Sequence, residues 1–227
     1  MIKELFLFLQ ITLIAFSGCK KSEVVVPPVE IDYPVHENIT VTYFYVGEPA
    51  DSNNGYIPND KSSWDGFWQQ HYGGVDDPVN RNGNYPKEFI PKENPFYFAL
   101  PYNDFGTNGN RKQSAADLIY WAKDKTWNAS ESMCKNQWIK ITKGSKSVYA
   151  QWEDCGPYYY DDSNYVFGSA LPLNQINYNS SGLDVSPAVR DYLGLADVDT
   201  VSWQFIRAAN VPGGPWKTII TTSQLSY

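Results

Sequence analysis

The chain has 227 residues, 42% of them hydrophobic, so it can bury one core with at most a small satellite. Its formal net charge of −7 argues against the clustered basic surface that nucleic acid or an anionic membrane would require, so no nucleic-acid partner is expected. The 8 Trp and 17 Tyr favour an all-β core with cross-strand aromatic pairs, or a surface on which sugars stack.

Residues 1–18 have the pattern of a targeting segment. Lys3 gives a short charged region, residues 5–14 are apolar, and small residues precede Cys19. The segment resembles a bacterial lipoprotein signal, and the resemblance implies a lipid on Cys19 that anchors the protein to a membrane. We therefore expect a protein of the bacterial cell envelope, held at the outer membrane and facing the periplasm or the surface. A plain secretory signal with an incidental Cys19 is the alternative.

The folded domain is predicted to follow an extended tether. Residues 19–37 hold several prolines among Val and acidic residues, a composition that favours an extended chain. The domain is predicted at residues 38–227, with a first β-branched and aromatic strand at 39–46.

A predicted insertion follows at residues 47–93, which are dense in Gly, Pro, Asn and Asp. Ser63 is placed to cap a short helix that carries Trp64 and Trp68. These two side chains either wall a binding groove or plug one end of the core.

A second strand is predicted at residues 95–100, with Tyr102 and Asp104 at its end. Residues 105–130 form another predicted insertion, in which Ser114 indicates the start of a helix at 114–127. A hairpin turn at residues 144–145 is predicted between strands at 137–143 and 146–153.

Two carboxylates are predicted near strand ends, on either side of a polar loop. Asp154 follows the strand at 146–153, and Asp184 lies in a short run at 182–185. The next helix has both ends encoded, with Ser186 as N-cap and Gly194 as left-handed stop. We expect chemistry where these two carboxylates meet.

Cysteine usage predicts one disulfide. Without Cys19, an even pair remains, Cys134 and Cys155, at the ends of predicted adjacent strands in an oxidising compartment. The two histidines show no ligand spacing with these cysteines, so neither a metal nor another cofactor is expected. The last segment, 210–227, is predicted to clamp the domain or to pair as an edge strand at 216–222.

Several motifs resemble the double-psi β-barrel of rare lipoprotein A, barwin and the expansins. The motifs are Cys134 with the strand after it, Asp-Cys-Gly-Pro at 154–157, Gly-Leu-Asp-Val-Ser at 182–186 and Val-Ser-Trp-Gln-Phe-Ile at 201–206. They occur in the order of those families. The resemblance implies a mainly β fold, a six-stranded double-psi β-barrel with short peripheral helices and long loop insertions.

The resemblance also implies carbohydrate chemistry. Asp184 matches the acid of family-45 endoglucanases, and Asp154 matches an Asp of rare lipoprotein A. Glycosidic cleavage usually needs a second carboxylate. The first strand has none, Glu48 and Asp51 lie beyond it, and Asp104 is a candidate for that role. As structural alternatives, Asp154 is a turn former and Asp184 ties down loop N–H groups.

Aromatic residues complete the predicted site. Of Tyr158, Tyr159 and Tyr160, at least one is expected to be exposed, because neighbours in an extended chain alternate sides. The candidate substrate-binding residues are Tyr43, Trp64, Trp68, Tyr102, Tyr158, Tyr159 and Tyr160.

Three functions remain open from the sequence. The protein binds and cleaves peptidoglycan or a β-glucan, binds such a glycan without cleaving it as expansins do, or contacts a protein partner as a structural component of the envelope. Tyr97 stands where rare lipoprotein A has a His, which keeps cleavage and binding both open. We expect a monomer.

Overall fold

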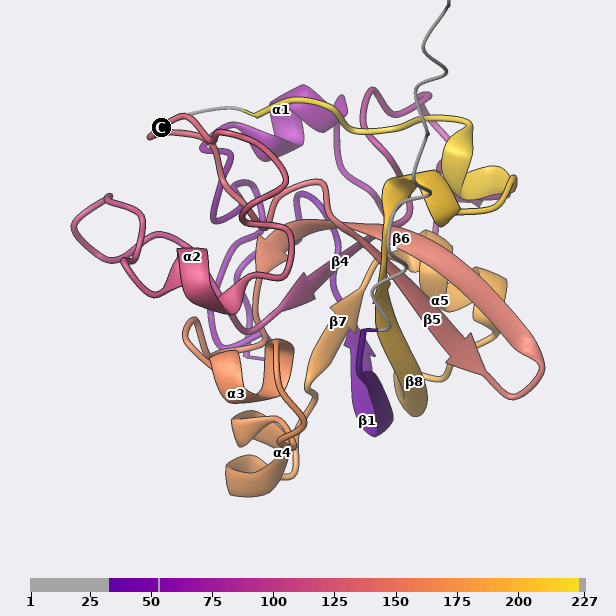
Figure 1. Cartoon of the computed structure of the whole chain (residues 1–227). Helices are drawn as coiled ribbons and strands as arrows, with labels where there is room; N and C mark the ends of the chain where they lie inside the picture. Colours follow the sequence, from indigo (N-terminus) through magenta and orange to yellow (C-terminus); the bar gives the residue numbers. More distant parts are fainter. Residues whose placement is uncertain (1–32, 53, 225–227) are drawn as a thin grey trace, which may run out of the picture. The chain divides into compact units, whose positions relative to one another are not determined.

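The computed structural model describes residues 33–52 and 54–224, so the predicted signal, Cys19 and residues 19–32 of the tether lie outside the described residues. Six strands close into a barrel in the order β1-β7-β4-β6-β5-β8 (Figure 1). A closed barrel leaves no sheet edge exposed. The mainly β fold with a closed six-stranded barrel is confirmed. The strands are β1 (Val35–Tyr43), β4 (Tyr97–Leu100), β5 (Trp138–Lys143), β6 (Lys146–Cys155), β7 (Leu183–Val185) and β8 (Val198–Ile206).

The strands pair in a pattern that occurs twice. β1 is parallel to β7 and antiparallel to β8, and β6 is parallel to β4 and antiparallel to β5. Antiparallel pairs β4–β7 and β5–β8 close the ring. The first three strands of the barrel therefore pair with the last three in a pseudo-twofold arrangement.

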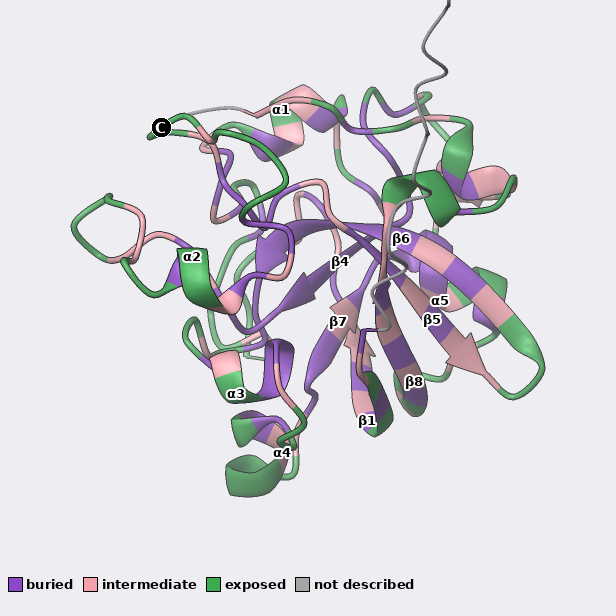
Figure 2. Ribbon diagram, viewed as in Figure 1, coloured by how far each residue is buried: buried purple, intermediate pink, exposed green. Residues whose placement is uncertain are grey.

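Alternate residues of every barrel strand fill the interior, as the two-residue period of a β-strand requires. Leu183 and Val185 of β7 and Phe98 and Leu100 of β4 are fully buried members of one core cluster. The other strands contribute in the same way, and Figure 2 shows β4 and much of β6 as buried. The same period puts the residues between these positions on the outer face of the barrel.

The insertion after β1 covers the outer face of β4. It contains α1 (Trp68–Tyr72) and a small ribbon of β2 (Arg81–Asn82) and β3 (Tyr85–Pro86). A second cluster of buried residues joins the two parts. Asp76 links them further, because its carboxylate accepts hydrogen bonds from Tyr97 Oη at 2.9 Å and from the Arg81 guanidinium at 2.6 Å. The insertion is thus fixed to the barrel. The second cluster consists of Phe44, Val46, Trp68, Tyr72, Tyr97 and Ala99.

Short helices occupy the periphery. They are α2 (Ala115–Leu118), α3 (Ser163–Val166), α4 (Leu173–Tyr178) and α5 (Pro187–Leu193), with 3-10 turns η1 (Ala208–Asn210) and η2 (Pro215–Lys217). α5 has the predicted ends, because Ser186 Oγ accepts the Val189 N–H at 3.3 Å and Gly194 has a φ of 73°.

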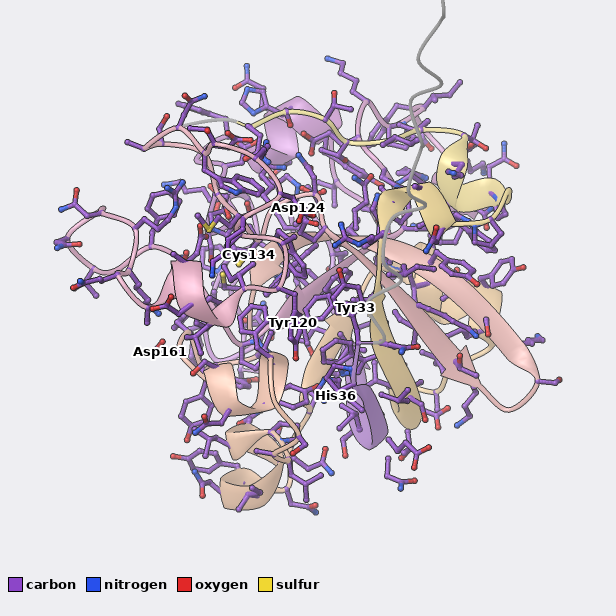
Figure 3. All side chains as sticks on the ribbon, in the orientation of Figure 1. Tyr33, His36, Tyr120, Asp124, Cys134 and Asp161 are labelled. Carbon is purple, nitrogen blue, oxygen red and sulfur yellow. The ribbon has the colours of Figure 1, made fainter. Side chains whose placement is uncertain are left out.

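Two predicted boundaries were wrong. The helix expected at 114–127 ends at Leu118, because Ile119 is extended and Trp121 turns inward, where its indole donates to the Met133 carbonyl. Tertiary packing of aromatic side chains overrides the helical pattern there. β1 also begins earlier than expected, at Val35, and Tyr33 is buried against Tyr120 with ring centroids 5.1 Å apart (Figure 3).

The last segment crosses the barrel without forming the strand expected at 216–222. Trp216 packs on Phe96 and Tyr149, with ring centroids 6.1 and 5.0 Å apart. Further along, Gln151 exchanges hydrogen bonds with the backbone of Thr221, both at 2.9 Å. These contacts are made by side chains, so the segment is packed against the barrel without pairing as a β-strand.

The predicted disulfide is wrong, since Cys134 and Cys155 are both buried free thiols. Cys155 Sγ donates to the Tyr102 carbonyl at 3.1 Å, and the backbone N–H of Cys134 donates to Ser132 Oγ at 3.0 Å. Figure 3 labels Cys134. Both thiols therefore lie in the same buried core, Cys155 at the end of β6 and Cys134 in the turn before β5.

We predict that both thiols are slow to react in the folded protein. Burial raises the pKa of each thiol, and the thiolate is the reactive form. The test uses a Cys19→Ser variant kept free of reductant. In the folded protein, an aromatic disulfide reagent is expected to react with both thiols far more slowly than after denaturation, when it should titrate both. A denatured sample that yields no thiol would restore the disulfide.

We predict a measurable cost for Ser186→Ala. The hydroxyl oxygen accepts N–H groups of both Val189 and Tyr97, each at 3.3 Å, so its removal uncaps α5 and leaves buried donors unpaired. Urea unfolding should show a loss of about 1–2 kcal/mol. Ser145→Ala, in the exposed hairpin turn, is the matched control and should change stability by less than about 0.5 kcal/mol.

Candidate functional site

A groove of about 970 Å³ lies on the outer face of the barrel. Its floor comes from β1, β7, β4 and the end of β6, and its walls come from the 47–63 part of the insertion and the loop after β6. We call it the acidic groove, since its lining includes the carboxyl groups of Glu48, Asp51, Asp154, Asp184 and Asp197.

The barrel register brings Asp154 and Asp184 to opposite sides of Ala99. Ala99 of β4 is paired with Asp184 of β7 on one side and with Asp154 of β6 on the other. Directly paired residues share a face, and strands lie about 4.8 Å apart, so the two backbone positions are about 10 Å apart. The small side chain of Ala99 leaves the space between them open as groove floor.

An extra residue in β6 orients Asp154. Trp152 is paired with Phe98, and the next pair along the two strands is Asp154 with Ala99, so Glu153 is extra. Strict alternation from the inward Trp152 would point Asp154 into the core as well. The irregularity turns Asp154 to the face of Ala99, in the way that bulges re-aim side chains elsewhere.

Asp184 is held by hydroxyl groups. Its Oδ1 accepts hydrogen bonds from Thr42 Oγ1 and, at 3.0 Å, from Ser181 Oγ. Burial raises the pKa of this carboxyl above its ordinary value, and the two hydroxyl donors act in the opposite direction. The side chain is half-buried at the groove floor, within reach of a ligand.

Asp154 is more enclosed, with 9% of its surface exposed. Its Oδ1 accepts the backbone N–H groups of Ser63 and Cys155, both at 2.7 Å. Burial raises its pKa to about 6, with a further upward contribution from the charge of Asp184. A carboxyl group with such a pKa is partly protonated near neutral pH, as a general acid must be.

Glu48 is a third carboxyl group in the groove, and the sequence placed it beyond the first strand without assigning it to the site. Asn59 Nδ2 donates to Glu48 Oε2 at 2.7 Å, and the backbones of the same two residues are bonded at 2.9 Å. Burial, with a smaller contribution from the charge of Asp184, raises the Glu48 pKa to about 7. The only sequence signal was a carboxylate soon after a strand end.

Tyrosines line the groove beside the carboxyl groups. Tyr158 and Tyr160 are 50% and 49% exposed and belong to the lining, as does Tyr43, whose ring lies under the Arg190 guanidinium at 4.4 Å. Tyr159 lies outside the lining, and its hydroxyl accepts from Asn177 Nδ2 at 3.1 Å. Tyr43, Tyr158 and Tyr160 therefore line the groove, and Tyr159 does not; their role in binding stays a prediction.

The predicted groove positions of Trp64 and Trp68 were wrong. Trp64 is 2% exposed, and its indole packs edge-on against Trp152 in the barrel core. Trp68 is buried against Phe44 and Tyr97 in the second cluster. Both rings pack as hydrophobic residues, the alternative that the sequence left open. Ser63 caps no helix, since α1 begins at Trp68 with Phe67 at its N-cap position. The Ser63 backbone N–H donates to Asp154.

Tyr102 and Asp104 also lie outside the groove lining, which corrects their predicted roles. Tyr102 is buried edge-on against Phe167 at 5.0 Å. Asp104 is fully buried, and its carboxylate accepts from Ser132 Oγ at 2.7 Å and from the Met133 N–H at 2.8 Å. Asp104 therefore organises the turn before β5.

Within residues 33–52 and 54–224, no group of three or more His, Cys, Asp or Glu side chains is arranged to hold a metal ion. In the same part of the chain, no helix combines the length and the apolar character that crossing a membrane requires.

Comparison with known proteins gives no family. No family model matches the chain, and no curated protein matches it. Among solved structures, the Streptomyces papain inhibitor (SPI) aligns with 78% of this chain and 100% of its own length, at 13% identity and a TM-score of 0.29. A likeness at this level carries no argument about function.

We predict that Asp154→Asn gains stability relative to wild type as the pH rises. A carboxyl whose folded pKa is raised contributes stability below its unfolded value near 4 and loses it as the pH rises through about 6. The variant keeps an oxygen acceptor for the two N–H groups. Between pH 4 and pH 8, urea unfolding should show a relative gain of at most about 3 kcal/mol. A pH-independent difference would contradict the raised pKa.

Proposed function

We propose that the protein binds a β-linked polysaccharide in the acidic groove and cleaves it by general acid–base catalysis. The observation that carries the proposal is the placement of Asp154 and Asp184 on one groove floor, on either side of Ala99. Exposed tyrosines at the groove supply flat apolar faces of the kind on which sugar rings stack.

The two carboxyl groups have different environments, which supports different roles. Asp154 has a pKa of about 6 and acts as the acid that protonates the leaving oxygen. Burial raises the pKa of Asp184, and the hydrogen bonds from two hydroxyl groups oppose that rise by favouring the charged form, in which Asp184 acts as the base for water. The strand of Ala99 between the two carboxyl groups leaves room for a water between acid and base, as the inverting mechanism requires.

The strand pairing supports a finer fold assignment, the double-psi barrel. In that proposal, the two parallel pairs β1–β7 and β4–β6 belong to interlocking halves of one barrel. The N-terminal sequence supports a lipid on Cys19 and a place in the bacterial cell envelope, where polysaccharide is the surrounding polymer.

Binding without cleavage is the second candidate. Asp154 Oδ1 already accepts hydrogen bonds from the backbone N–H groups of Ser63 and Cys155, an arrangement that also suits a purely structural carboxylate. The proposed experiment separates the two functions by measuring binding and turnover on the same polymer.

We predict that Asp154→Asn and Asp184→Asn each lower turnover of the polysaccharide by about 10²-fold or more, while the binding constant changes by only a few fold. The release of reducing ends and affinity electrophoresis measure the two quantities. Wild-type turnover should fall as the pH rises above about 6, because Asp154 then loses its proton.

Asp117→Asn, an exposed substitution outside the groove, is the control and should leave both quantities unchanged. Binding by all four proteins with turnover by none would leave a non-catalytic glycan-binding module. An absence of binding to peptidoglycan and to β-glucans would overturn the proposal.

A further inference from the structure

The lining of the acidic groove is strongly unbalanced in charge. It contains five carboxyl groups, of which Glu48 and Asp154 are partly protonated near neutral pH, and one ammonium group, that of Lys61. The hydrogen-bond donors to Glu48, Asp154 and Asp184 are amide and hydroxyl groups, and none of these three has an ion-pair partner among the described residues. The negative charge that these three groups carry therefore has no ion-pair compensation within the described part of the chain.

Such a negative charge discriminates between kinds of sugar polymer. A chain that bears carboxylates brings like charges into a partly desolvated groove, where their repulsion is less screened than in bulk water. An uncharged chain presents hydroxyl groups, which donate hydrogen bonds to carboxylates at no such cost. The stem peptides of peptidoglycan carry free carboxylates, whereas a β-glucan carries none.

Two carboxylates lie at the exposed margin of the groove. Asp51 belongs to the insertion after β1, and Asp197 belongs to the loop before β8. Both are exposed, and neither flanks Ala99 on the groove floor. A polymer bound in the groove would come close to these marginal charges.

We propose that the acidic groove selects an uncharged β-linked polysaccharide and rejects chains that bear carboxylates, and that Asp51 and Asp197 set this selectivity. The inference rests on the proposed function, since it names the substrate class of the same groove. It adds a specificity role for two residues that take no part in the proposed chemistry.

The test uses polymers that share a backbone and differ in charge. Hydroxyethyl cellulose is compared with carboxymethyl cellulose, and glycol chitin with carboxymethyl chitin, by affinity electrophoresis of the full chain at low and high salt. We expect the uncharged member of at least one pair to bind about tenfold or more tightly than its anionic partner at low salt. Salt should narrow this ratio, because ions screen the repulsion.

The double variant Asp51→Asn, Asp197→Asn should lower the preference severalfold by strengthening binding of the anionic polymer, with little change for the uncharged one. Glu37→Gln with Asp117→Asn removes the same number of charges from exposed positions outside the groove and should keep the preference.

The outcomes separate the two proposals. Equal or tighter binding of the anionic polymers would overturn the selectivity and leave the glycan-binding function in place. If the control variant loses the preference as much as the groove variant does, the preference comes from net charge, and the role of Asp51 and Asp197 is overturned. Binding to none of the four polymers would overturn both proposals together.

Discussion

The site depends on the position of β4 between β6 and β7. A single residue of β4, Ala99, has Asp154 beside it on one neighbour and Asp184 on the other. Neither pairing is local, since these residues are 55 or more positions from Ala99 along the chain. In the closed barrel each strand has two hydrogen-bonded neighbours, and those of β4 are β6 and β7. The pairing of β4 with both β6 and β7 therefore also assembles the two carboxyl groups.

The second constraint is the anchoring of the insertion after β1. Asp76 is buried, and the hydrogen bond that it accepts from the Tyr97 hydroxyl ties the insertion to the outer face of β4, while its ion pair with Arg81 lies within the insertion. A buried ion pair contributes more to orientation than to net stability, because desolvation offsets much of its attraction. Here the contacts of Asp76 fix the position of the insertion. With the insertion fixed, Glu48 stands over the same floor as Asp184, and the groove has a wall.

Most local signals and the barrel itself were predicted correctly from the sequence, whereas several positions that distant packing decides were not. The β5–β6 hairpin and the ends of α5 depend on neighbours in sequence, such as Gly144 or Ser186, and both were predicted. Asp154 and Asp184 were named because strand ends and helix caps mark them. Trp64, the helix expected after Ser114 and the disulfide were wrong, because distant packing decides each. Glu48 was passed over, since only the folded insertion brings it to the groove.

The remaining question is why a fold would keep this arrangement. Burial raises the pKa of Asp154, Asp184 and Glu48 alike, so each ionised form is disfavoured, and their proximity adds repulsion. A core built for stability alone would place apolar or amide side chains at such positions. The nearby Glu153 shows the structural solution, since it is buried against the ammonium group of Lys135. Among the described residues, none of the carboxyl groups of Asp154, Asp184 and Glu48 has such an ion-pair partner. A site that uses proton transfer and hydrogen bonding to hydroxyl groups has a physical reason for this arrangement.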